Sequence, residues 1–300
     1  MKQIAIIIVI FLHLNLFGQE LSEEAGVFEV QLIRHYHEYG DILGMRKGKT
    51  NRKSRPYQKL YFNSKGTLLK AISFGKHHDA DLRLIDNINV YNYKEEKLIE
   101  SIKYVSDYEG NLYPYYKSIY TYNEKEQLVD ESTFYYKTDS LFFKTTYEYD
   151  LNSNNVKTIF NPTYYQREFD SLNRIIVLRK VYKNELRWAF NYMYADNIRT
   201  GIFQTYYNDG KDYSIKETKK YNSKGLLVET EEVHLSKDGL DKKTKYFYDK
   251  NGMILSVEKY NSCSFEKTYR LVWSYKIRTK SNTKINYEIA ERINKHINID

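Results

Sequence analysis

The chain has 300 residues, of which 41% are hydrophobic and 16% aromatic, and its formal net charge is +8. Nucleic-acid-binding proteins usually concentrate Lys and Arg on one face, whereas here these residues are scattered along the chain, so nucleic acid is excluded as a partner. The single Cys, Cys263, excludes an internal disulfide framework, and stability therefore has to come from packing.

Residues 1–18 have the pattern of a secretory signal peptide. Lys2 supplies the positive start, residues 4–17 form the apolar stretch, and the small residue Gly18 precedes the expected cleavage site. A membrane-spanning helix needs about 20 apolar residues, and this run is shorter and interrupted by polar side chains. We expect export to the periplasm, the cell envelope or the extracellular space, with no lipid or transmembrane anchor after cleavage.

Residues 19–55 contain none of the repeats that fill the next part of the chain. Residues 29–39 are apolar and aromatic in places, and residues 46–55 are basic and rich in turn formers. We predict an N-terminal cap followed by a basic loop.

Residues 56–279 repeat a short phrase: an aromatic residue, Asn or Asp, two turn residues, often Gly, and then an aliphatic residue. An Asn or Asp that starts a type I turn, with a left-handed Gly at its end, makes a bulged β-hairpin. The 32 Tyr and only 3 Pro also favour strands. We therefore predict a hairpin tip at each copy of the Asn/Asp position, which falls at Asn63, Lys94, Asn123, Asp150, Asp170, Ala195, Asn222, Asp249 and Lys276.

The turn geometry fixes which side chains face each other across a hairpin. The aromatic residue is expected opposite the residue six places later, and such aromatic–aliphatic pairs set the register of a sheet. The predicted pairs are Phe62 with Leu68, Tyr93 with Ile99, Tyr122 with Leu128, Phe169 with Ile175, Tyr221 with Leu227 and Tyr248 with Ile254. The Asp150 and Ala195 copies fit the pattern poorly, and we expect a bulge or an altered loop at both.

A second aromatic position precedes the tip aromatic by two residues, and the two share one face of a strand. Rings on a buried face form a core, which the aliphatic partners favour; rings on a solvated face stack on sugars, bases or partner side chains. Both interpretations stay open. The candidate binding residues are Tyr91, Tyr120, Tyr147, Tyr192, Tyr246 and Trp273.

Residues 280–300 show a different pattern, because Ile285, Ile289, Ile293 and Ile297 recur at a spacing of four. This apolar stripe predicts a short amphipathic helix. Repeat arrays commonly need an atypical end, so we expect a C-terminal helical cap.

His77, Asp79 and Asp81 form the one candidate metal site. On a strand these three would share a face and reach one divalent ion. The alternative, a solvated polar loop, is favoured because no second cluster accompanies them. We expect no cofactor and no enzymatic activity, since a linear array of hairpins need not form a cleft with converging catalytic groups.

The repeats resemble the Rhs or YD-repeat family, whose units carry Tyr-Asp, a turn, Gly and an aliphatic residue. The match is best at Tyr248-Asp249-Lys250-Asn251-Gly252-Met253-Ile254 and weaker at Tyr149-Asp150 and Phe169-Asp170. It covers about three quarters of the chain but lacks the Gly-Arg pair usual after the turn. Long family members build β-rich shells around a toxin domain, a role not expected of this shorter chain.

We predict an all-β protein in which antiparallel hairpins form one extended, twisted or superhelical sheet with a short C-terminal helix. The expected function is an exported, non-enzymatic binding or structural module that contacts protein or glycan. The sequence does not indicate an oligomeric state. Two alternatives are a neutralising or accessory partner of a secreted toxin and a metal-dependent enzyme centred on the segment from His77 to Asp81.

Overall fold

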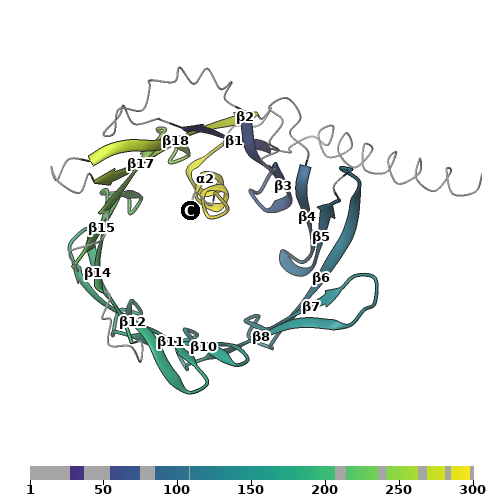
Figure 1. Ribbon diagram of the computed structural model, residues 1–300, viewed down its shortest axis with the longest axis horizontal. Helices are drawn as coiled ribbons and strands as arrows, with labels where there is room; N and C mark the ends of the chain where they lie inside the picture. Colours follow the sequence, from purple (N-terminus) through teal and green to yellow (C-terminus); the bar gives the residue numbers. More distant parts are fainter. Residues whose placement is uncertain are drawn as a thin grey trace, which may run out of the picture.

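The computed structural model describes residues 28–36, 55–74, 85–107, 109–206, 214–235, 241–262, 269–280 and 285–297. Its strands form one 18-stranded antiparallel sheet, and Figure 1 shows that sheet as a ring. The strands are β1 (Phe28–Tyr36), β2 (Arg55–Phe62), β3 (Leu68–Phe74), β4 (Ile85–Lys94), β5 (Lys97–Ser106), β6 (Leu112–Tyr122), β7 (Leu128–Tyr135), β8 (Leu141–Tyr149), β9 (Asn155–Phe160), β10 (Thr163–Phe169), β11 (Ile175–Tyr182), β12 (Glu185–Ala195), β13 (Ile198–Thr205), β14 (Ser214–Tyr221), β15 (Leu227–His234), β16 (Lys242–Tyr248), β17 (Ile254–Ser262) and β18 (Tyr269–Lys280).

Strand β1 closes the sheet into a barrel. Its Leu32 lies opposite Gln58 of β2 on one side and Ile277 of β18 on the other. The prediction of an extended twisted or superhelical sheet was therefore wrong, since the ring leaves no open edge. Eighteen twisted strands are enough to close on themselves, and closure satisfies the hydrogen bonds that two free edges would leave unpaired.

The hairpin tips follow the predicted turn chemistry. At the Asn222 tip, Gly225 N donates to Asn222 O at 2.9 Å, and the Asn222 side chain accepts hydrogen bonds from the backbone of Lys224 and Leu226. Gly225 has φ of 76°, which a residue without a Cβ adopts at no steric cost. Five of the six predicted pairs are confirmed: Phe62 with Leu68, Tyr122 with Leu128, Phe169 with Ile175, Tyr221 with Leu227 and Tyr248 with Ile254.

Three of the predicted tips differ from the prediction. No tip forms at Lys276, which lies within β18 and pairs with Ser256 of β17 and Ile33 of β1, because the residues that follow it contain no turn former. Tyr93 pairs with Leu98 instead of Ile99, because Glu95 and Glu96 both have positive φ and make a two-residue turn that shortens the loop by one position. The Asp150 copy was expected to be irregular, but it forms the regular tip.

Asn and Ser can occupy the left-handed conformation that Gly usually takes, and at the Asp150 tip Ser153 does so with φ of 66°. The altered loop expected at Ala195 is confirmed. There Ala195 pairs directly with Ile198 across a two-residue turn.

Helix α2 (Tyr287–Asn294) identifies the inward face of the barrel. It lies inside the ring in Figure 1, and its Ala290 and Ile293 are fully buried. The strand and tip residues packed with it are Phe28, Val30, Leu32, Leu60, Phe62, Leu68, Ala71, Met253, Ile254, Val257 and Ile277. Directly paired residues on neighbouring strands share one face of a sheet. Strand by strand, the register therefore shows which residues of the ring face inward.

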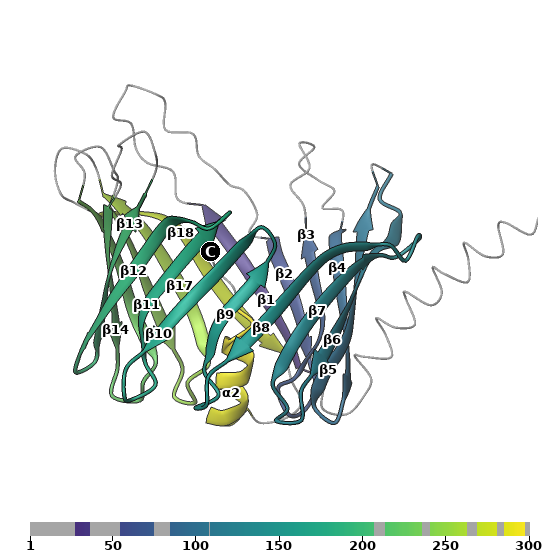
Figure 2. The same cartoon turned by 90° about the horizontal axis from the view of Figure 1, so that it is seen from below.

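The predicted C-terminal helix is therefore present, and it packs against the inner wall of a closed barrel. Asn286 caps its first turn by accepting a hydrogen bond from Ile289 N at 2.9 Å. Asn294 holds its other end, donating to Gly252 O at 2.7 Å and accepting from Ile254 N at 3.1 Å. Figure 2 shows the helix at the barrel end that carries the short repeat tips.

The outward face carries charged side chains that pair across neighbouring strands. Lys144 lies 2.6 Å from Asp130, and Lys220 lies 2.7 Å from Glu229. Further outward pairs are Glu29 with Lys59, Glu148 with Lys157, Glu168 with Arg179, and Glu231 with Lys243. Within the described residues, no helix is long and apolar enough to cross a membrane.

Candidate functional site

The predicted tyrosine stripe lies on the inner wall. Register places Tyr91, Tyr120, Tyr147, Tyr192 and Tyr246 on the inward face, each partly exposed. Tyr91 and Tyr246 also pack against the buried cluster around α2. The stripe is therefore partly core near the helix and an accessible wall elsewhere.

The remaining candidates are Trp273 and the predicted metal ligands. Trp273 belongs to β18, where the register sets its backbone opposite Lys259. His77, Asp79 and Asp81 lie outside the described residues. Among the residues that are described, no three His, Cys, Asp or Glu side chains gather closely enough to hold a metal ion.

The tip tyrosines tie each hairpin to the one before it. The Tyr122 hydroxyl donates to Leu98 O at 3.0 Å, and the Tyr194 hydroxyl donates to Ile175 O at 2.7 Å. Tyr149 and Tyr248 make the same contact with their preceding hairpins. These hydroxyls are therefore used in hydrogen bonds within the wall. The second row of tyrosines, two residues earlier in each strand, faces the interior.

The hydroxyls of Tyr93 and Tyr147 stay protonated at neutral pH. Burial, reinforced by the neighbouring rings of Tyr91, Tyr120 and Tyr122, raises the pKa of Tyr93 to about 12. Burial and the nearby Glu131 carboxylate likewise raise the pKa of Tyr147 to about 12. These groups can therefore both donate and accept hydrogen bonds.

A second set of rings runs around the inner wall towards the end opposite the repeat tips. We define this aromatic belt as Phe143, Phe160, Tyr165, Trp188 and Phe203. Successive ring centroids lie 6.0, 5.2, 5.7 and 5.6 Å apart, which is within contact distance for aromatic pairs. The belt thus crosses β8, β9, β10, β12 and β13 without a break.

Beside the belt lies a cluster of rings from β6, β7 and β8. Phe142 stacks on Tyr116 with centroids 4.8 Å apart and meets Tyr135 at 5.0 Å. Phe142 is 49% exposed and Phe143 is 41% exposed, so these rings are accessible despite their mutual contacts. Large exposed aromatic side chains gathered in one place are typical of binding surfaces.

The sequence interpretation missed this belt, although β12 shows the signal for it. Trp188, Phe190, Tyr192 and Tyr194 occupy every second position, which places four rings on one face of a single strand. Opposite Tyr192 lies Gly201, where an added Cβ would come within 2.8 Å of the ring. The missing side chain lets Tyr192 lie over the wall and stack on Phe190 at 5.5 Å.

Charged residues on the inner wall include a paired set and two cations without an ion pair among the described residues. On β13 to β16 they are paired: Glu217 lies 3.6 Å from Arg199 and 3.1 Å from Lys219, and Glu232 lies 3.6 Å from Lys242. On β10 and β11 the inward Arg167 and Lys180 have no ion pair within the described part of the chain. The wall beside the aromatic belt is therefore electropositive on these two strands.

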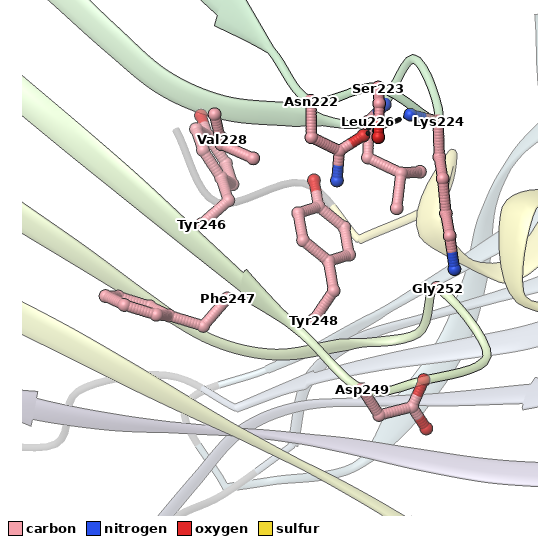
Figure 3. A pocket seen from close by; sticks show the side chains of 10 residues that line it. All are labelled: Asn222, Ser223, Lys224, Leu226, Val228, Tyr246, Phe247, Tyr248, Asp249 and Gly252. Atoms are coloured by element: carbon pink, nitrogen blue, oxygen red, sulfur yellow. Dashed lines mark hydrogen bonds between the residues drawn. The ribbon is translucent and has the colours of Figure 1, made fainter.

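A small hollow lies between the Asn222 and Asp249 tips, with a volume of about 340 Å³. Figure 3 shows Tyr248 pointing across it towards the Asn222 tip, with Tyr246 beside Val228. Its polar groups are already used, because the Asp249 carboxylate accepts hydrogen bonds from Asn251 N and Met253 N. We assign this hollow to packing between hairpins and the inner wall to binding.

Comparisons with known proteins do not identify a family, since no family model and no curated protein match the chain. A porin-like protein from Bacteroides uniformis is 10% identical, over 85% of this chain and 98% of its own, with a TM-score of 0.41. A TcdB2-TccC3-Cdc42 structure is 13% identical over 85% of this chain, which spans 20% of that one, with a TM-score of 0.33. With scores this low, neither likeness bears on family or function, and the YD-repeat resemblance stays a prediction.

Proposed function

We propose that this protein is an exported, non-enzymatic barrel that binds glycan chains against its inner wall. The observation that carries the proposal is the continuous aromatic belt, whose rings touch one another and yet remain exposed in part. A structural core would bury such rings. Among the residues that the structure describes, the fully buried rings are Phe28 and Phe62, and both pack in the cluster around α2.

The inner wall is the better binding face for physical reasons. Barrels of 16 to 18 strands are too wide for their own side chains to fill, so the interior keeps room for a ligand. Outward side chains, by contrast, are engaged with one another in cross-strand ion pairs such as Asp130 with Lys144. A ligand inside the barrel would meet rings that have few other partners.

The chemistry of the wall matches a sugar better than a purely apolar ligand. Sugars have apolar C–H faces that stack on flat rings and hydroxyls that need hydrogen-bond partners, and Tyr offers both. Between the belt and the tyrosines lies a row of small hydroxyl side chains, where Ser118 and Thr133 hydrogen-bond at 2.8 Å. Stacking surfaces and hydroxyls therefore alternate along the wall.

The outer wall supports an aqueous location for the exported chain. Charged side chains on a lipid-facing barrel surface are costly, and this surface carries ion pairs from β1 to β16. Together with the expected signal peptide, this supports a periplasmic, envelope-associated or extracellular protein whose outer face contacts water.

Trp188 provides a direct test, because it sits in the belt and the chain has only one other Trp. In a Trp273→Phe background, neutral oligosaccharides should change Trp188 fluorescence saturably. Tyr165→Ala should weaken that response, and Tyr164→Ala, its outward neighbour on β10, should not. If no glycan changes the signal while a protein from envelope extracts binds the barrel, a protein ligand replaces the glycan.

A further inference from the structure

We propose that the inner wall selects acidic glycans, with Arg167 and Lys180 binding the carboxylate of a uronic acid residue. This inference rests on the proposed glycan-binding function and specifies its substrate class. It is carried by the unpaired cations of β10 and β11 and by their position beside the aromatic belt.

Neutral groups hold Arg167 in place. Its Nη1 donates to Asn155 Oδ1 at 2.6 Å and to Thr158 Oγ1 at 2.9 Å, both on the adjacent strand β9. Within the described residues no hydrogen-bond partner occupies its Nε or Nη2. The guanidinium is thus oriented by one nitrogen, and its other edge is free.

In the described part of the chain, the surroundings of Arg167 contain rings and hydroxyls but no carboxylate. Burial lowers the pKa of Arg167, and the groups that oppose this are the hydroxyls of Tyr147, Tyr149 and Tyr165. The inward Glu131 lies three strands away on β7, where it accepts a hydrogen bond from Tyr147 at 3.3 Å. Partly buried arginines are usually paired with carboxylates, so this one lacks the counter-charge that a ligand would supply.

Lys180 adds a second cation to the same patch. Arg167 is paired with Leu178 on β11, so Lys180 is its diagonal neighbour, at a separation of roughly 7–8 Å. Lys180 is itself directly opposite Tyr165 on one side and Trp188 on the other. A sugar stacked on Tyr165 and Trp188, whose centroids are 5.7 Å apart, would carry its substituents towards both cations.

The geometry fits a carboxylate. The free Nε–Nη2 edge of a guanidinium forms two parallel hydrogen bonds with the two oxygens of one planar carboxylate. The ammonium of Lys180 adds a second positive charge beside that carboxylate. A carboxylate attached to a ring that stacks on aromatic side chains describes a uronic acid residue within a glycan.

Oligogalacturonate and its fully methyl-esterified form make a matched probe pair, because they share the sugar rings and differ in the charge. In the Trp273→Phe protein, Trp188 fluorescence should report tighter binding of the acidic form. Arg167→Gln should weaken that form by about 10- to 100-fold, the value of a charge-assisted hydrogen bond, and leave the ester unchanged. Arg179→Gln, an outward change on β11, is the control for both ligands.

The outcomes separate the two levels of the proposal. If the acid and the ester bind equally in wild type and in Arg167→Gln, the acidic preference is overturned while glycan binding stands. If neither ligand binds and neutral glycans also fail, the proposed function itself falls. Loss of the acidic preference in Arg167→Gln alone, with an unchanged unfolding midpoint, supports the assignment.

Discussion

The Tyr149 hydroxyl donates a 2.7 Å hydrogen bond to the carbonyl of Leu128, the first residue of the return strand in the preceding hairpin. The ladder between β7 and β8 begins two residues later, at Asp130, so this carbonyl has no strand partner on that side. Tyr122, Tyr194 and Tyr248 satisfy the equivalent carbonyls of their own neighbours. The tip tyrosine therefore extends each ladder with a side chain.

Replacing Tyr149 with Phe should remove this bond and leave the ring in place. The expected loss is about 0.5–1.5 kcal/mol in the free energy of unfolding, measured by urea titration. Tyr164→Phe is the matched control, because Tyr164 is outward and contacts Lys157 through its ring face at 4.7 Å. Equal effects of the two changes would show that the Tyr149 hydroxyl contributes nothing.

Two glycines test how α2 docks. Gly225 and Gly252 have φ of 76° and 81°, so Ala at either position incurs the left-handed penalty of about 1–2 kcal/mol. A Cβ at position 252 would also come within 2.9 Å of the Tyr287 ring, whereas one at position 225 meets nothing within 4 Å. Gly252→Ala should therefore reduce the free energy of unfolding more than Gly225→Ala.

The additional loss of stability at Gly252 should depend on its contact with α2. In a Tyr287→Ala background, where the obstructing ring is absent, the two glycine substitutions should cost the same in urea unfolding. A difference that persists in that background would place the strain at Gly252 in the turn and not at the contact with α2.

His296 makes stability sensitive to acid. Its ring lies 5.8 Å from Phe62, and burial, helped by Lys295, lowers its pKa below the ordinary 6.5. The unfolded chain binds the proton more readily, so the free energy of unfolding falls as pH drops below about 6.5. His296→Phe should reduce that decline between pH 7.5 and 5, and an unchanged decline would contradict the assignment.

Ionisation of the inner-wall tyrosines should destabilise the fold at high pH. Tyr93, Tyr147, Tyr192 and Tyr248 have pKa values raised to about 12, chiefly by burial. Their contribution is complete below pH 10, the unfolded value, and is lost as pH rises towards 12. Absorbance at 295 nm should show a late-titrating group that moves to about pH 10 in urea.

Turn geometry was predictable from sequence where a residue type strongly favours one backbone conformation. Asn222 with Gly225 specifies its turn, and the register of five hairpins follows from such tips. Glu95 and Glu96 gave no comparable signal, since non-Gly residues rarely take positive φ. For this reason the predicted partner of Tyr93, Ile99, is wrong by one residue.

Closure was not predictable from the repeats, because it depends on a strand outside them. In β1, Phe28, Val30 and Leu32 alternate with polar residues, but no tip motif marks this strand as the partner of both β2 and β18. The same limit applies to the site. Tyr147 could be assigned to a face from its spacing, whereas Arg167 and Lys180 are brought together by pairing between β10 and β11.

The most direct measurement of the central claim compares two reporters on strand β12. Trp188 faces inward in a Trp273→Phe protein, and Met193→Trp in a Trp188→Phe, Trp273→Phe protein faces outward, where Met193 is 59% exposed. On adding glycan, the inward reporter should respond saturably and the outward one should stay constant. A response confined to position 193 would place binding on the outer wall and contradict this account.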